Sequence, residues 1–286
     1  MKIKEFYGRG RAVLSFEIFP PKKEGTLDSV FPTIEQLQVL KPDFIGVTCG
    51  AGGTGGRNLT VPLAAAIREK CGIESMAHVT CMSSGPADVD RIMDDLRASG
   101  VQNIMALRGD RNPDLEQKHD FRHADELVAY IREHGDFGIC AACYPETHFE
   151  APDSATDLRN LKHKVNCGAD VLVSQLFFDN DHFLTFREKA RREGIDVPIS
   201  AGIMPVTNKK QIERMVTMCG ASLPPKLVKM LQKYEGDPVA LTDAGIAYAV
   251  AQIADLLTEG VDGIHIYTLN KPDIAGKITA SIRSLL

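Results

Sequence analysis

The chain has 286 residues, of which 44% are hydrophobic and 25% are charged, and this ordinary globular composition excludes a collagen-like or largely disordered protein. Lysine and arginine total 33 and aspartate and glutamate total 38, which gives a net charge of −5. Because the chain has no basic surplus, its composition argues against a nucleic-acid-binding protein.

Short apolar runs alternate with helical patterns along the whole chain. The near-continuous apolar runs are typical of parallel strands buried on both faces. They predict strands at 12–19, 44–49, 75–81, 103–108, 138–144, 171–177, 199–204 and 263–269. A period near 3.6 predicts helices between them at 27–40, 59–71, 86–99, 124–134, 155–167, 181–193 and 209–219. Two further helices, 226–234 and 238–259, are predicted before the last strand, and one at 274–284 after it.

This alternation predicts one (β/α)8 TIM barrel, a single α/β domain over residues 1–286 with extra helices before the last strand. A doubly wound open sheet is the alternative. Active sites of such barrels lie at the carboxyl ends of the strands, and polar side chains occur late in seven of the eight predicted strands. They are Glu17, Thr48, His78, Thr80, Arg108, Asp110, Tyr144, Gln175, Tyr267 and Asn270.

The residue types at these strand ends limit the chemistry of the predicted site. No predicted strand contains lysine, which argues against a Schiff-base aldolase. The first strand lacks the His-x-His that begins a hydrolase metal centre, and we predict no metal site. No nucleophile elbow or Walker loop is present. One carboxylic acid, an Arg–Asp pair and several neutral hydrogen-bonding groups fit a site that holds a large organic cofactor.

Other motifs favour a structural interpretation. The glycine loop 50–55 formally matches G-x-G-x-x-G, but it follows the second predicted strand and no acidic residue ends the third. We therefore interpret it as a flexible loop over the barrel mouth. Cys140 and Cys143 lie three residues apart on one predicted strand and should point to opposite faces, as buried thiols rather than a redox or zinc pair.

The remaining signals concern location. The N-terminal sequence has no apolar signal region, and no run of about 18 apolar residues predicts a membrane span. Seven irregularly spaced cysteines are typical of reduced thiols, so we expect a cytoplasmic protein.

The polar strand ends lie in segments that resemble the methylenetetrahydrofolate reductase family. The matching segments run from the first predicted strand to the last: 15–21 (SFEIFPP), 47–51 (VTCGA), 78–81 (HVTC), 106–110 (ALRGD), 142–146 (ACYPE), 175–179 (QLFFD), 202–205 (GIMP) and 267–270 (YTLN). In this order they are highly specific. The resemblance implies a (β/α)8 barrel with FAD as cofactor.

The resemblance also implies a role for each matching position. Glu17 resembles the general acid and Asp110 the carboxylate beside the flavin ring. The residues implied to bind FAD are Thr48, His78, Arg108, Gly109, Asp110, Ala142, Tyr144, His148, Asp157, Asn160, His163 and Lys164. Those implied to bind the folate substrate are Glu17, Gln175, Leu231, Tyr267 and Lys271. From the sequence alone, a solvated helix face is the alternative for Asp157, Asn160 and Lys164.

The implied reaction has two halves. NADH or NADPH passes a hydride to FAD and leaves. Then 5,10-methylenetetrahydrofolate binds, its five-membered ring opens to an iminium ion, and reduced flavin delivers hydride to give 5-methyltetrahydrofolate for methionine synthesis. Ring opening needs a proton on the departing nitrogen, which Glu17 supplies if it is partly protonated near neutral pH, while ionised Asp110 stabilises the cation.

Some positions depart from the family pattern. His163 stands where the family often has a second basic residue, Leu231 where a stacking aromatic is often found, and Lys271 where a bacterial relative has arginine. The chain ends after the last predicted helix, so we expect no C-terminal regulatory domain and no inhibition by S-adenosylmethionine through one. We also expect a homo-oligomer.

Two other functions stay open. One is a different FAD barrel oxidoreductase similar to proline dehydrogenase. The sequence segments around Glu17 and around Arg108 to Asp110 argue against it. The other is a barrel that binds flavin or pterin without turnover. The presence of both carboxylates, Glu17 and Asp110, argues for catalysis instead.

Overall fold

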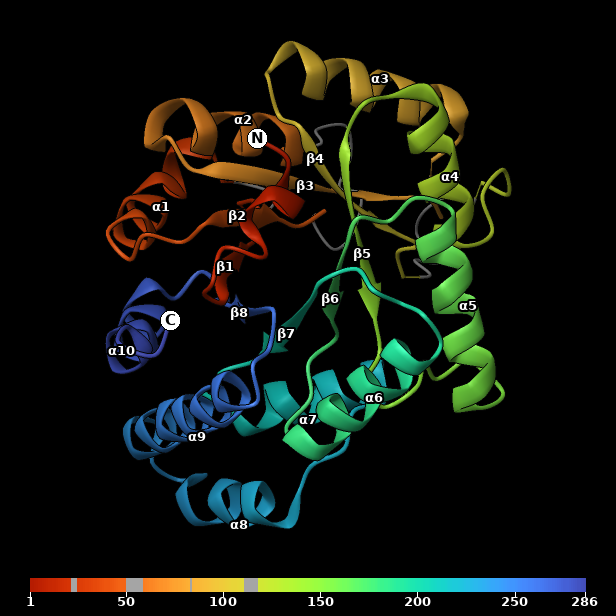
Figure 1. Ribbon diagram of the computed structural model, residues 1–286. Helices are drawn as coiled ribbons and strands as arrows, with labels where there is room; N and C mark the ends of the chain where they lie inside the picture. Colours follow the sequence, from red (N-terminus) through yellow and green to blue (C-terminus); the bar gives the residue numbers. More distant parts are fainter. Residues whose placement is uncertain (22–24, 50–58, 83, 111–117) are drawn as a thin grey trace.

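A computed structural model describes residues 1–21, 25–49, 59–82, 84–110 and 118–286. Within these residues, eight parallel strands each pair with the next, and the last pairs with the first (Figure 1). The strands are β1 (Val13–Ile18), β2 (Phe44–Val47), β3 (Glu74–Thr80), β4 (Asn103–Leu107), β5 (Gly138–Cys143), β6 (Val171–Ser174), β7 (Ile199–Ile203) and β8 (Gly263–Tyr267). This closed order confirms the predicted TIM barrel and excludes the doubly wound open sheet.

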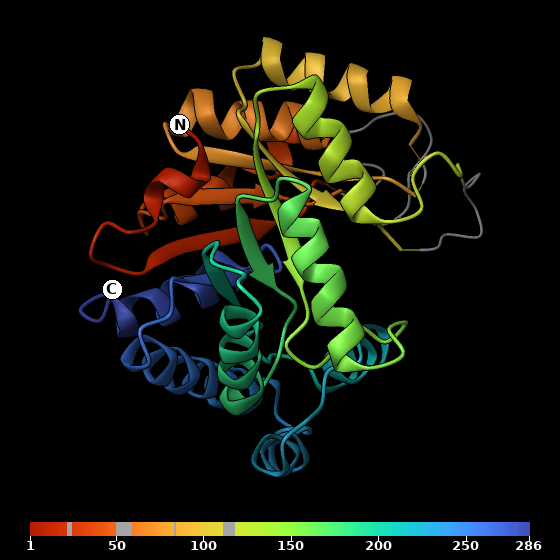
Figure 2. The same cartoon turned by 45° about the vertical axis from the view of Figure 1, so that its right-hand side comes forward.

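Helices surround the barrel in both views (Figure 1, Figure 2). They are α1 (Phe31–Gln38), α2 (Thr60–Cys71), α3 (Pro86–Ala98), α4 (Ala124–His134), α5 (Ser154–Asn166), α6 (Asn180–Arg192), α7 (Lys209–Cys219), α8 (Pro225–Tyr234), α9 (Pro238–Thr258) and α10 (Pro272–Ile282). As predicted, α8 and α9 are the extra helices before β8. Short 3-10 helices occur at η1 (Ile3–Phe6) and η2 (Leu27–Ser29).

The predicted boundaries differ from the observed ones mainly at element ends. The helix predicted at 27–40 is η2 followed by α1, whose second residue is Pro32. Proline lacks a backbone N–H and favours the first turn of a helix, so the helix begins anew there. The strand predicted at 171–177 ends at Ser174. The apolar residues after it pack outside the strand, where Phe177 stacks on Phe183 of α6 with ring centroids 5.0 Å apart.

Alternate residues of the strands face opposite sides of the barrel wall. One buried apolar cluster fills the barrel interior and includes Val13, Met76 and Cys140, while a second, larger cluster between strands and helices includes Cys143. The prediction that Cys140 and Cys143 point to opposite faces is therefore confirmed. All seven cysteines lie in the described part of the chain, and all are free thiols.

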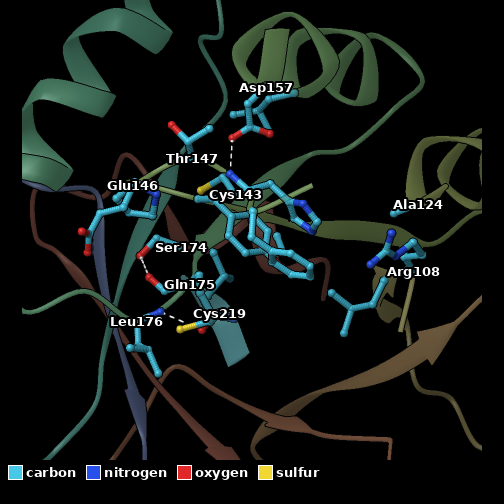
Figure 3. A pocket seen from close by; sticks show the side chains of 18 of the residues that line it. Arg108, Ala124, Cys143, Glu146, Thr147, Asp157, Ser174, Gln175, Leu176 and Cys219 are labelled. Atoms are coloured by element: carbon cyan, nitrogen blue, oxygen red, sulfur yellow. Dashed lines mark hydrogen bonds between the residues drawn. The ribbon is translucent and has the colours of Figure 1, made fainter. Parts of the chain in front are cut away.

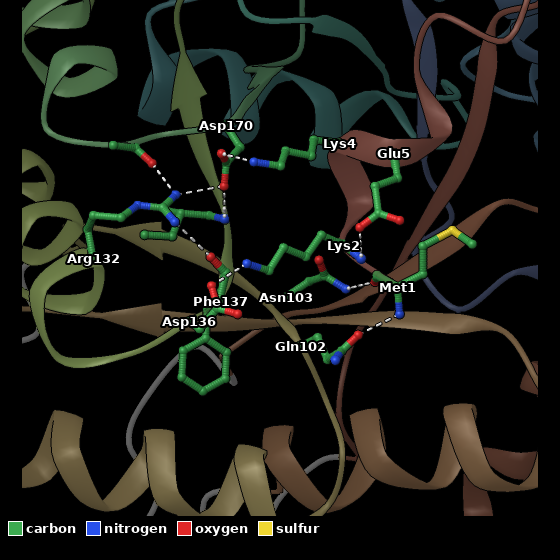
Figure 4. Close-up of polar contacts among 12 residues, drawn as sticks. Met1, Lys2, Lys4, Glu5, Gln102, Asn103, Arg132, Asp136, Phe137 and Asp170 are labelled. Carbon is green, nitrogen blue, oxygen red and sulfur yellow. Dashed lines mark hydrogen bonds and ion pairs between the residues drawn. The ribbon is translucent and has the colours of Figure 1, made fainter.

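The N-terminal segment closes the amino end of the barrel. Ile3 of η1 is buried in the interior cluster, and its backbone N–H donates to Asn103 Oδ1 at 2.8 Å. Asp170 forms ion pairs with Arg132 at 2.7 Å and with Lys4 at 3.1 Å (Figure 4). Side chains fill this end of the barrel and close it to ligands. A ligand can therefore approach the interior from the opposite end, where the strands have their carboxyl ends.

Helix α9 qualifies the expectation about membrane spans. By length and composition alone it is apolar enough to cross a membrane, a test that the core helix of a globular protein also passes. It packs against α10, α8 and α6 and buries Leu241, Ile246, Ile253 and Leu256 in apolar clusters. We therefore interpret it as a core helix of the barrel.

Candidate active site

A cavity of about 1610 Å³ opens at the carboxyl ends of the strands. Typical ligand pockets measure about 300–1,000 Å³, so this one has room for more than one drug-sized ligand. It is lined by most of the predicted site residues, namely Glu17, Thr48, His78, Arg108, Gly109, Asp110, Ala142, Tyr144, His148, Asp157, Asn160, His163, Lys164, Gln175 and Tyr267. Figure 3 shows Arg108, Asp157 and Gln175 around this cavity.

The structure does not bring two predicted substrate residues into the cavity. Leu231 of α8 is buried in an apolar cluster with Leu227 and Met204. Lys271 precedes α10, and its Nζ donates to Thr207 Oγ1 at 2.9 Å. The helix that carries Leu231 thus has its apolar face packed on residues that follow β6 and β7, and Leu231 is buried behind the cavity lining.

Glu17 near the end of β1 lies between two imidazoles. Its Oε2 atom is 3.7 Å from His78 Nε2 and 3.6 Å from His265 Nε2. His78 extends from β3 across β2 at Gly46, where a Cβ would lie 3.4 Å from His78 Nε2. Burial lowers the pKa of His78, and the charge of Glu17 opposes this shift only in part. At neutral pH His78 is therefore uncharged, and Glu17 has no cation there as partner.

Two buried polar atoms at this site lack hydrogen-bond partners within the described residues. They are Thr48 Oγ1 and His78 Nε2. Both residues line the cavity. Buried polar atoms are nearly always hydrogen-bonded, so this pair indicates that a bound ligand completes the site.

The segment from Arg108 to Asp110 follows β4 and has no regular secondary structure. Gly109 has φ +86°, and a Cβ there would lie 3.0 Å from the side chain of Thr80. Only glycine adopts this conformation without strain. Arg108 pairs with Glu150, with Nη2 and Oε1 3.2 Å apart, and this pairing raises the pKa of Arg108. A guanidinium at the cavity wall suits a phosphate.

Helix α5 presents a second group of predicted cofactor residues. Lys164 Nζ donates to the Ala142 carbonyl at 2.7 Å, and Asp157 Oδ2 accepts the His148 backbone N–H at 2.9 Å. Burial lowers the pKa of Lys164 despite the nearby Cys143, Asp157 and Asp125. A solvated helix face is therefore wrong for Asp157 and Lys164, which are partly buried, whereas Asn160 is exposed.

Two tyrosines and a glutamine also line the cavity. Tyr267 donates its hydroxyl to the Ser174 carbonyl at 2.7 Å, and Gln175 Oε1 accepts the Leu176 N–H at 2.8 Å. Burial, with the charge of Asp110 as the next contribution, raises the pKa of Tyr144 to about 12. Burial also raises the pKa of Tyr267 well above its usual value. Both phenols therefore stay protonated at neutral pH.

Sequence reasoning missed three polar residues around the site. His265 and Ser15 lie on the inner face two residues before Tyr267 and Glu17, a spacing that could have revealed them. Glu150 lies in the loop between β5 and α5, where no periodicity places it. Among the described residues, no group of three or more His, Cys, Asp or Glu side chains could hold a metal ion.

Comparison with known proteins gives a consistent result. A family model described as methylenetetrahydrofolate reductase matches residues 2–283. The 5,10-methylenetetrahydrofolate reductase of Pectobacterium carotovorum is 38% identical over 267 residues, which cover 93% of this chain and 89% of that protein. The Escherichia coli enzyme of the same name is 35% identical with the same coverage. The NADH enzyme of Arabidopsis thaliana is 37% identical, and the match covers 94% of this chain and 48% of that protein.

Solved structures share the barrel at low sequence identity. An uncharacterized protein from Clostridium thermocellum that binds two copies of 5-methyl-5,6,7,8-tetrahydrofolic acid matches with a TM-score of 0.67 and 16% identity, covering 96% of both chains. A dihydropteroate synthetase structure matches with a TM-score of 0.54 and 13% identity, covering 96% of this chain and 95% of that one. These two matches show the fold alone.

Proposed function

The chain belongs to the methylenetetrahydrofolate reductase family, and from this premise we propose that it reduces 5,10-methylenetetrahydrofolate to 5-methyltetrahydrofolate with FAD as cofactor and NADH or NADPH as reductant. The two substrates react in turn, in a ping-pong sequence that feeds methyl groups to methionine synthesis. The observation that carries the proposal is the placement of Glu17 between His78 and His265 at a cavity that Asp110 also lines.

The residues present fit FAD. The unpartnered atoms Thr48 Oγ1 and His78 Nε2 would take up hydrogen bonds from the flavin part of the molecule. Arg108 and Lys164 would hold the diphosphate through charge. The cavity volume of about 1610 Å³ fits a dinucleotide together with a second ligand. Bound FAD would supply the hydride chemistry, since no protein side chain carries a hydride.

The protein's own residues supply binding and proton transfer. Glu17 donates a proton to the departing ring nitrogen of the folate. Asp110, exposed at the cavity edge, stabilises the iminium cation through its charge. The protonated phenols of Tyr144 and Tyr267 wall the site and keep water from the reacting carbon.

A flavin- or pterin-binding barrel without turnover is the second candidate. The Clostridium thermocellum protein binds two copies of a methylated folate, so a barrel of this shape can hold folate. The carboxyl group of Glu17 argues for catalysis instead, because simple folate binding gives no reason for an acid between two imidazoles. We also propose a cytoplasmic location, which the seven free thiols support.

A spectroscopic experiment tests the proposal. The purified protein should show the visible absorption of oxidised flavin, lose it anaerobically on addition of NADH or NADPH, and regain it on addition of 5,10-methylenetetrahydrofolate. Flavin that is reduced but not reoxidised by the folate would favour another oxidoreductase. A colourless protein that binds folate would favour the second candidate.

A further inference from the structure

Glu146 is a mostly buried carboxylate at the cavity that the proposed reaction does not use. It follows β5, its side chain is 13% exposed, and it lines the cavity together with Cys219 (Figure 3). Its Oε1 and Oε2 atoms accept the backbone N–H of Ser222 at 3.1 and 3.0 Å. His182 Nε2 is 3.8 Å from Oε2, which is beyond hydrogen-bond distance. The carboxylate therefore ties the chain at Ser222 to the carboxyl end of β5.

Ser222 lies just beyond the carboxyl end of α7. Residues 221–224, between α7 and α8, have no regular secondary structure. Of the residues of α7, only Ile212 is fully buried, so partly buried side chains hold much of this helix on the barrel. Three residues of α7 at spacings of three and four share one face and line the cavity, namely Met215, Met218 and Cys219. The contact between Glu146 and Ser222 therefore helps to set how closely this face approaches the cavity.

Two exposed apolar side chains lie at this edge of the cavity. Phe149 is 59% and Met218 is 55% exposed, and both line the cavity. Phe149 approaches the end of α7, because a Cβ at Gly220 would lie 3.6 Å from the Cβ atom of Phe149. The ring of Phe149 stacks on His148, with ring centroids 4.7 Å apart. Exposed apolar side chains that line one cavity suit an apolar group of a ligand, and a phenyl ring and a thioether both favour an aromatic one.

We propose that Glu146 is a positioning residue that holds the carboxyl end of α7 at the cavity, and that Phe149 and Met218 bind the aromatic ring of a substrate there. The exchanging substrates of the proposed reaction, the folate and NADH or NADPH, both carry aromatic rings, and the two half-reactions distinguish them. The inference rests on the proposed function for the identity of the substrate, whereas the contact of Glu146 with Ser222 does not depend on it.

A first test measures the contact directly. Hydrogen exchange of the Ser222 amide is recorded by NMR on the purified full chain as isolated, in wild type, Glu146→Ala and Glu146→Gln. Loss of a hydrogen bond to a charged group should speed this exchange by about tenfold or more in Glu146→Ala. Glu146→Gln keeps a carbonyl acceptor and should retain part of the protection. Glu213→Ala, at an exposed position of α7, is the control. A Ser222 amide that exchanges equally fast in wild type and Glu146→Ala would overturn the proposal.

A second test measures substrate binding in each half-reaction by stopped-flow absorption over a range of substrate concentrations. Phe149→Ala should raise the apparent dissociation constant of one substrate by about three- to tenfold, with the limiting rate and the flavin content retained, and Met218→Ala should act in the same direction. Phe149→Tyr keeps the aromatic ring and should bind as wild type does. Val239→Ala is the control, because Val239 is 71% exposed but does not line the cavity. A shift in the folate half-reaction assigns the bound ring to the folate, and a shift in flavin reduction assigns it to the reductant.

The Glu146 variants link the two measurements. Glu146→Ala should weaken binding of the same substrate as Phe149→Ala, by a smaller factor, and Glu146→Gln should recover part of the loss. Unchanged dissociation constants for both substrates in Phe149→Ala, or loss of its flavin, would contradict the inference, as would a Glu146→Ala protein that weakens binding of the other substrate.

Further measurements cover the failure of a variant or of the proposed function. If Glu146→Ala does not fold, Glu146→Gln and the variants of Phe149 and Met218 still decide the inference. If wild type fails the folate half-reaction, the proposed function fails. Exchange at Ser222 then still tests the contact, and calorimetry with 5-methyltetrahydrofolate on wild type and Phe149→Ala still tests the binding of an aromatic ring.

Discussion

The two ends of the barrel both hold polar side chains away from water, but their partners differ. At the amino end, Asp170 accepts a hydrogen bond from the Ile139 N–H at 2.9 Å and pairs with Arg132 and Lys4. At the carboxyl end, Thr48 Oγ1 and His78 Nε2 have no hydrogen-bond partner among the described residues. Asp170 thus finds its partners within the protein, whereas, among the described residues, the two carboxyl-end atoms have none and line the cavity, unlike Glu74 Oε2 and Ser75 Oγ, which lack hydrogen-bond partners at the start of β3 but do not line it.

The unpartnered atoms at the cavity indicate that the carboxyl end carries function. A polar group that finds its partner within the chain stabilises the fold, and a buried one without a partner that also lines a cavity indicates a binding site. Substitutions at the carboxyl end should therefore change chemistry more than stability. Substitutions at the amino end should change the stability of the fold more than the reaction. A variant at either end with the opposite pattern of effects would refute the comparison.

The largest expected effect is that of Glu17→Gln. Glutamine keeps the size of the side chain but cannot donate an acidic proton. The folate half-reaction should fall by about 10² or more, the scale for loss of a positioned acid, while NAD(P)H still bleaches the flavin. Stopped-flow measurement of each half-reaction is the test. Glu235→Gln, at an exposed pair with Lys209, is the matched control.

Two outcomes would contradict this prediction. Equal slowing of both half-reactions would mean that Glu17 supports only the fold or the flavin. A folate half-reaction near the wild-type rate would mean that another group donates the proton.

Arg108→Ala should give the second largest effect, on flavin retention. A hydrogen bond to a charged group contributes about 1.5–3 kcal/mol, so we expect FAD to dissociate about ten- to a hundredfold more readily. Flavin fluorescence on dilution measures this. Arg159→Ala serves as control, since Arg159 of α5 is exposed and bonds to Thr156 of the same helix. Unchanged flavin content and dissociation in Arg108→Ala would show that this side chain does not hold the cofactor.

The sequence predicts the barrel well because strand and helix periodicities are local. The inner-face residues Glu17 and Tyr267 follow from the same alternation, since the ends of parallel strands meet at one rim. Glu150 could not be predicted, because its pairing with Arg108 depends on a loop that returns to the rim. Leu231 differs from these, because only the family resemblance implies a substrate role for it, and the packing of α8 buries it in the structure. The glycine loop 50–55 lies outside the described residues.

Asp170→Asn tests the amino end. Burial by itself would raise the pKa of Asp170, but hydrogen bonds from the Ile139 N–H, Arg132 and Lys4 outweigh it, and the pKa is lowered. The variant should lose about 1–3 kcal/mol of the free energy of unfolding at pH 7, with both half-reactions retained. A lowered folded-state pKa stabilises above the unfolded value of about 3.9. The difference between wild type and variant should therefore shrink as the pH falls below about 4.

Urea unfolding at several pH values measures this difference. Asp94→Asn is the control, because Asp94 pairs with Arg97 on the surface of α3 and is 73% exposed, and its effect should stay within about 0.5 kcal/mol. Loss of flavin reduction in a stable Asp170→Asn protein would mean that the amino end also serves the reaction.

The smallest effect is expected for the double variant Cys140→Ala, Cys143→Ala, in the wall between the two ends. Burial raises the pKa of Cys143 to about 12 and raises that of Cys140 as well, so neither thiol is a thiolate at neutral pH. The two side chains also lie on opposite faces of β5, in different apolar clusters, and cannot form a disulfide without moving the strand. Turnover should stay within about twofold of wild type, and stability should fall by about 1 kcal/mol for the small cavities left behind. Loss of flavin reduction in a folded, flavin-loaded double variant would show that electrons pass through the thiols, contrary to the geometry of the strand.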